Sequence, residues 1–91
     1  MTEQETYMAQ ALALAREAAA AGEVPVGCVI VRGGEIVGRG RNRREEKQST
    51  ASHAEMEAIA MANETVGSWR LDDCTLYAVS YTHLRAHETS A

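Results

Sequence analysis

The stretch Ser52-His53-Ala54-Glu55-Met56-Glu57-Ala58-Ile59-Ala60 decides how the chain is organised. It predicts a helix over residues 53 to 64, whose first turn carries His53 and Glu55 two positions apart. First-turn side chains splay outward from the end of a helix, so both can point into one pocket. A neutral imidazole binds Zn²⁺, and a nearby carboxylate takes and returns protons. The pair is therefore a candidate metal and catalytic site.

The same residues also have a purely structural explanation. Ser52 and Glu55 have the spacing of a capping box, in which Ser52 caps the helix and the Glu55 carboxylate reaches back to the backbone. His53 is then an incidental residue of the first turn. For an isolated H-x-E pair this explanation is preferred, because so short a motif often occurs by chance.

A first helix is predicted over residues 3 to 21, a run of strong helix formers. Thr2 and Glu5 fit a capping box at its start, and Gly22 follows as its stop. The apolar residues of this run are mostly small and fall on one narrow stripe. Such a stripe suits close packing against a sheet.

A β-hairpin is predicted next, over residues 25 to 41. The β-branched run at residues 28 to 31 indicates a strand that is buried on both faces. Gly33-Gly34 suits a type I′ turn, and residues 35 to 40 form the returning strand. After the second helix, residues 74 to 79 indicate a third strand. The order helix, hairpin, helix, strand predicts an α/β fold with helices packed on a small mixed sheet.

A cluster of positive charges follows the hairpin, interrupted by Glu45 and Glu46. One explanation is a solvated strand end and loop, and the other is a rim that contacts the phosphates of a nucleic acid. Asn42 stands where the strand ends and can turn its amide into a pocket. The cationic residues are Arg39, Arg41, Arg43, Arg44 and Lys47.

Composition limits the class of protein. The chain has 91 residues, enough for one small domain, and 45% of them are hydrophobic. Phe is absent and aromatic residues make up 4%, so the core is expected to consist of Ala, Val, Leu, Ile and Met. The formal net charge of −4 argues against a strongly basic nucleic-acid-binding domain.

Cys28 and Cys74 lie far apart, each in an apolar run and without C-x-x-C spacing. They are predicted to be buried, reduced thiols. The sequence shows neither a signal peptide nor an apolar run of about 18 residues. It therefore predicts a soluble, cytoplasmic protein with no membrane association.

Five segments, in this order and at matching spacing, resemble the N-terminal half of bacterial tRNA-specific adenosine deaminases. H-A-E alone is shared with other zinc deaminases of bases, whose signature is H-x-E…P-C-x-x-C. The V-P-V-G segment and the asparagine after the hairpin narrow the resemblance to the tRNA enzymes. The segments are Val24-Pro25-Val26-Gly27, Gly33-Gly34, Asn42, His53-Ala54-Glu55, and Trp69-Arg70-Leu71 with Thr75-Leu76-Tyr77.

The resemblance implies a cytidine-deaminase-like αβα fold, one catalytic zinc per subunit and a homodimer. It also implies conversion of wobble adenosine to inosine in a tRNA anticodon stem-loop. By this match His53 is a zinc ligand and Glu55 is the catalytic proton shuttle. Asn42 and Ala54 are the expected contacts to the target nucleoside.

The match ends after the third predicted strand. The family continues into Glu-Pro-Cys-x-x-Cys, whereas this chain has His83 and Ala86 at the two cysteine positions. We therefore expect residues 1 to 79 to be the N-terminal part of a deaminase domain, truncated after the third strand. Residues 80 to 91 are expected to be an unrelated tail, left by a sequencing or truncation artefact.

Two explanations remain for the histidines of that tail. If residues 83 to 87 were helical, His83 and His87 could complete a three-histidine zinc site with His53. Otherwise they are two histidines in a disordered tail.

Three functions stay open on the sequence alone. The first is a tRNA adenosine deaminase, which the Asn42 position and the arginine-rich segment favour. The second is a zinc deaminase of a free base or nucleoside, of the guanine or cytosine type. The third is a non-catalytic fragment, because two of the three expected zinc ligands are missing.

Overall fold

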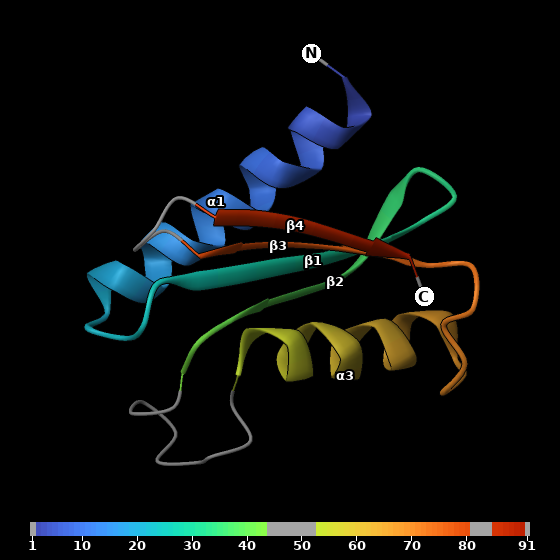
Figure 1. Cartoon of the computed structure of the whole chain (residues 1–91). Coiled ribbons are helices and arrows are strands. Elements are labelled where there is room, and N and C mark those ends of the chain that lie inside the picture. Colours follow the sequence, from blue (N-terminus) through green and yellow to red (C-terminus); the bar gives the residue numbers. More distant parts are fainter. Residues whose placement is uncertain (1, 44–52, 81–84, 91) are drawn as a thin grey trace.

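A four-stranded sheet carries one helix on each face in the computed structural model, which describes residues 2–43, 53–80 and 85–90 (Figure 1). The strand order is β2-β1-β3-β4, and every adjacent pair is antiparallel. In chain order the elements are α1 (Glu3–Ala20), β1 (Val26–Arg32), β2 (Glu35–Arg41), α3 (Ala54–Val66), β3 (Thr75–Ser80) and β4 (Arg85–Ser90).

The first helix begins and ends as the sequence predicts. The Thr2 hydroxyl accepts from the Glu5 N–H at 3.1 Å, and the Glu5 carboxylate accepts from the Thr2 N–H at 3.1 Å. This capping box satisfies two backbone donors that lack partners within the helix. At the other end, Gly22 adopts a φ of 78° just beyond the Ala21 C-cap. A residue with a β-carbon is strained in that conformation.

The hairpin is confirmed, including its turn. β1 and β2 pair from Gly27 with Arg41 to Arg32 with Glu35, with one register shift between Ile30 and Val31. The two turn glycines have φ of 58° and 81°. A type I′ turn needs positive φ at both central residues, which is why two consecutive glycines stand there.

β1 is buried on both faces, also as predicted. Cys28 and Ile30 pack towards α3, while Val29 and Val31 pack on the α1 side. Both cysteines of the chain are buried and free of disulfide bonds, as expected. The core on the α1 side includes Tyr7, and its hydroxyl donates to the carbonyl of Gly34 at 2.9 Å.

Glycine and alanine bring α3 against the backbone of β2. The three fully buried residues of α3 are Ala54, Ala58 and Ala62. A β-carbon at Gly40 would overlap the Ala54 carbonyl oxygen, and one at Gly38 would overlap the Ala58 carbonyl oxygen. No side chain larger than hydrogen therefore fits at either strand position without moving the helix.

The α/β class with helices packed on a small sheet is confirmed, but the sheet is not mixed. β2 and β3, which α3 connects, run in the same direction, since each is antiparallel to β1. β1 lies between them and opposes both, so no parallel neighbours occur among the described strands. The expected mixed sheet is therefore wrong in this respect.

The described sheet also continues beyond the third strand. β4 lies antiparallel to β3, and Glu88 accepts hydrogen bonds from the Gln4 side chain of α1 at 2.8 and 3.2 Å. β3 offers a free backbone edge, and residues 85–90 pair with it as a fourth strand. That residues 80–91 are a tail unrelated to the domain stays a prediction. The three-histidine hypothesis required a helix over residues 83 to 87, but residues 85–87 are strand.

Neither of the two described helices combines the length and apolarity that a membrane span requires.

Candidate functional site

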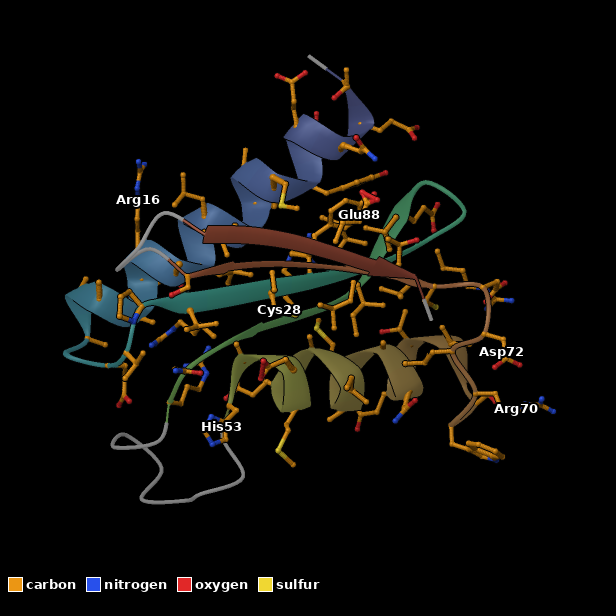
Figure 2. The ribbon with its side chains drawn as sticks, in the orientation of Figure 1. Arg16, Cys28, His53, Arg70, Asp72 and Glu88 are labelled. Atoms are coloured by element: carbon orange, nitrogen blue, oxygen red, sulfur yellow. The ribbon has the colours of Figure 1, made fainter. Side chains whose placement is uncertain are left out.

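Helix α3 begins at the histidine of the motif. His53 is the N-cap residue, with an extended backbone at φ −80° and ψ 153°. Its side chain makes no capping hydrogen bond and is exposed at the start of α3 (Figure 2). The capping-box hypothesis placed the N-cap at Ser52, so it is wrong by one residue, and Ser52 itself lies outside the described residues. The imidazole is left available for a ligand.

Asn42 caps this helix from another element. Its side-chain oxygen Oδ1 accepts from the backbone N–H of Ala54 at 2.9 Å, and only 9% of the Asn42 surface is exposed. Because a backbone N–H can only donate, the oxygen of the amide must face it, which fixes the orientation of the amide. The Nδ2 group, with two donors, is then directed elsewhere and can bind a ligand. The structure thus brings Asn42 to the start of the helix that carries His53 and Glu55.

Ala54 contributes backbone and no exposed side chain. Its methyl group is fully buried, and its N–H is already engaged by Asn42. Its position in the first turn places it between His53 and Glu55. A direct contact between Ala54 and a substrate stays a prediction.

Glu55 has an exposed side chain, but its negative charge affects the pKa of the buried Cys28 thiol in β1. Burial and, as a smaller contribution, the negative charge of Glu55 together raise the pKa of the Cys28 thiol to about 12. Cys28 is fully buried in β1, beneath the start of α3. The thiol therefore stays protonated at neutral pH, and the role of Glu55 as an acid–base group stays a prediction.

The described residues do not fit a complete catalytic zinc site. Such sites use three protein ligands and keep one position for water. Within residues 2–43, 53–80 and 85–90, His, Cys, Asp and Glu side chains form no group of three that could hold a metal. His53 offers one exposed imidazole at the start of α3, and Cys28 is buried beneath that helix. His83 lies outside the described residues.

Two of the arginines after the hairpin bind carboxylates of neighbouring helices. Arg43 Nε lies 2.8 Å from Glu57 Oε1 of α3, and Arg41 Nε lies 3.9 Å from Glu17 Oε1 of α1. These contacts favour a structural role for both cations over a free phosphate-binding rim. Arg44 and Lys47 lie outside the described residues. Sequence reasoning missed the Arg43–Glu57 pair, because no local pattern connects residues 14 positions apart on different elements.

Comparison with known proteins assigns this chain to a protein family. Residues 1–85 match the model of the cytidine and deoxycytidylate deaminase zinc-binding region. The chain belongs to this family. The match reaches beyond the predicted boundary at residue 79, and that boundary stays a prediction.

Individual relatives narrow the resemblance. The chain is 49% identical over 77 residues to a tRNA-specific adenosine deaminase of Streptococcus pyogenes, which is 85% of this chain and 48% of the relative. Its identity to the tRNA-specific adenosine deaminase of Bacillus subtilis is 47%, again over 48% of the relative. The predicted resemblance to bacterial tRNA-specific adenosine deaminases is confirmed. The chain spans about half the length of these curated relatives.

Solved structures agree on the fold. A tRNA:A34 deaminase, studied for A-to-I editing at the wobble position of transfer RNA, superposes with a TM-score of 0.81 at 38% identity. That match covers 86% of this chain and 60% of the other. Guanine deaminase from Bacillus subtilis gives a TM-score of 0.75 at 39% identity, covering 81% of this chain and 48% of the other. The cytidine-deaminase-like fold is thereby confirmed.

Proposed function

We propose that this chain is part of a deaminase that converts wobble adenosine to inosine in the anticodon stem-loop of a tRNA. The observation that carries the proposal is the meeting of Asn42 with the first turn of α3, at His53 and Glu55, in a chain 49% identical to a tRNA-specific adenosine deaminase. The protein would act in the cytoplasm as a homodimer.

Each residue has a separate role in this proposal. Glu55 takes one proton from the attacking water and passes it to the purine ring nitrogen. It then takes the second proton from the new hydroxyl group and passes it to the departing amine, which leaves as ammonia. Asn42 donates from Nδ2 to the target nucleoside while its oxygen holds the helix. The backbone at Ala54 lines the same position.

His53 is proposed as one zinc ligand of the longer protein. The family matched by residues 1–85 is named for a zinc-binding region. Zinc would supply an activated water in that longer protein. His53 alone is too few ligands for a catalytic site, and the described residues form no group of three that could hold a metal, so the 91-residue chain is proposed to be inactive by itself.

A chimera tests the function directly. Residues 1–79 would be joined to the remaining part of the Bacillus subtilis tRNA-specific adenosine deaminase, and inosine would be measured on an anticodon stem-loop with adenosine at the wobble position. The proposal expects inosine from the chimera and none from the 91-residue chain. A chimera that is folded and zinc-loaded but forms no inosine would contradict the proposal.

Deamination of free guanine is the second candidate, because the guanine deaminase of Bacillus subtilis shares 39% identity and a TM-score of 0.75. The same chimera should be incubated with guanine and the release of ammonia followed. Ammonia from guanine without inosine in the stem-loop would favour this candidate over the first.

A further inference from the structure

Two consecutive residues at the end of β2 reach the first turn of α3. Asn42 Oδ1 accepts from the Ala54 N–H at 2.9 Å, and Arg43 Nε donates to Glu57 Oε1 at 2.8 Å. Ala54 and Glu57 are three residues apart, which is a rise of about 4.5 Å along the helix axis, so the two contacts hold different residues of the first turn. Two anchors at different heights restrict rotation of the helix against the strand end, which one hydrogen bond alone does not.

The Arg43–Glu57 ion pair is partly buried, which distinguishes it from an ion pair on the open surface. The side chains of Arg43 and Glu57 are 32% and 16% exposed. Water and salt screen a pair at this depth less than a fully exposed one. The bond is also charge-assisted and short, so it is stronger than a hydrogen bond between neutral groups.

The glycines of β2 set the distance between α3 and the strand, whereas the ion pair restrains the first turn of α3. Gly38 and Gly40 set how closely the helix approaches the strand, because a β-carbon at either position would overlap helix backbone. The alanine face that fits against these glycines also limits rotation of the helix about its axis. The Arg43–Glu57 contact adds a restraint at the strand end, three residues beyond Ala54.

We propose that the Arg43–Glu57 ion pair is a positioning device that holds the Asn42 amide on the Ala54 N–H. It thereby sets the direction in which Asn42 presents Nδ2 to a nucleoside, and this last step rests on the proposed function. Neither Arg43 nor Glu57 needs to touch the substrate.

Amide hydrogen exchange of the 91-residue chain tests the device without any need for activity. The variants are Arg43→Gln, Glu57→Gln and the double variant, with Glu64→Gln as the matched control on an exposed position of α3. Exchange of the Ala54 amide should accelerate about fivefold in either single variant, since a charge-assisted bond is about twice as strong as a neutral one. Exchange at Ala58, inside the helix, should stay unchanged in all variants.

The double variant separates positioning from general stability. If the two residues act through their mutual contact, the double variant accelerates Ala54 exchange by less than the combined effect of the two single variants. Additive effects would overturn the proposal. So would equal acceleration at Ala54 and Ala58, which indicates loss of overall stability, or no acceleration at Ala54.

A separate titration distinguishes this proposal from the proposed function. The parent chain would be titrated with an adenosine-containing anticodon stem-loop while the side-chain amide signal of Asn42 is followed by NMR. A shift at Asn42 that weakens in Glu57→Gln supports the link to the substrate. No shift in the parent chain would count against a tRNA substrate, while the Ala54 exchange result would still decide the role of the ion pair.

Discussion

Replacement of Asn42 separates its structural role from its proposed binding role. Asn42→Ala removes the acceptor of the Ala54 N–H, which is buried at the helix start. Asn42 is only 9% exposed, so water does not readily replace the lost oxygen. Loss of an N-cap or of a partner to a buried donor costs about 1–2 kcal/mol. In a domain of this size each kcal/mol lowers the Tm by about 4–8 °C.

Asn42→Asp is the informative partner variant. A carboxylate keeps an acceptor for the Ala54 N–H and carries a negative charge at a helix N-terminus, which is favourable by about 0.3–1 kcal/mol. Partial burial of the charge offsets some of this gain. The Tm of Asn42→Asp should therefore lie clearly above that of Asn42→Ala. Asp has no amide donor, so both variants should lose binding of the nucleoside.

The assay is thermal unfolding of the 91-residue chain, followed by circular dichroism, with Asn63→Ala as the control. Asn63 lies on the same helix, and its buried Oδ1 accepts no hydrogen bond in the described structure. Its replacement should lower the Tm less than Asn42→Ala does. A Tm for Asn42→Ala equal to that of the parent chain would refute the capping role, and so would equal losses for Ala and Asp.

Three further predictions follow from the same geometry. Gly40→Ala should lower the Tm by more than Asn42→Ala, because its β-carbon overlaps the Ala54 carbonyl oxygen. Gly33→Ala is the comparison in which the β-carbon meets no other atom and only the positive φ is strained. In the chimera, Glu55→Gln should reduce inosine formation at least about 100-fold with zinc content and Tm unchanged, since an amide neither takes up nor releases a proton at neutral pH; a parent-like rate would exclude Glu55 as the proton shuttle. The free energy of unfolding should fall as pH rises from about 9 towards 12, because the Cys28 thiol has a pKa of about 12 when folded and 9.0 in its reference state. Denaturant titrations at each pH should show that Cys28→Ala flattens this fall, and an identical slope in both proteins would contradict it.

The parts of the fold that short sequence patterns control were predictable. Gly33-Gly34 predicts the turn because few other residues adopt positive φ twice in succession, and Thr2 with Glu5 predicts the helix start through reciprocal hydrogen bonds three residues apart. The order of the strands follows from no local pattern. It depends on which edge of β1 remains free when the chain returns from α3.

The site shows the same division. The H-x-E spacing predicts that His53 and Glu55 lie together at a helix start, and the structure has them at the N-cap and in the first turn of α3. The actual cap of that turn comes from Asn42 on β2, so a capping pattern within the helix sequence pointed to the wrong residue. The partner of Arg43 was equally hidden, since a charged side chain on a strand end can pair with any helix that the tertiary structure brings near it.

Close packing explains why a side chain as short as asparagine can organise this site. The interface of α3 with β2 is formed by glycines on the strand and alanines on the helix, so the helix backbone lies directly on the sheet. At that separation the amide of Asn42 reaches the Ala54 N–H with an ordinary hydrogen-bond length. A larger residue at Gly40 would move the helix start away from the strand end. Asn42 would then lose its contact with Ala54, although His53 and Glu55 themselves were unchanged. The position of His53 and Glu55 therefore depends on the glycines of β2 and the alanines of α3, which have no reactive side chains.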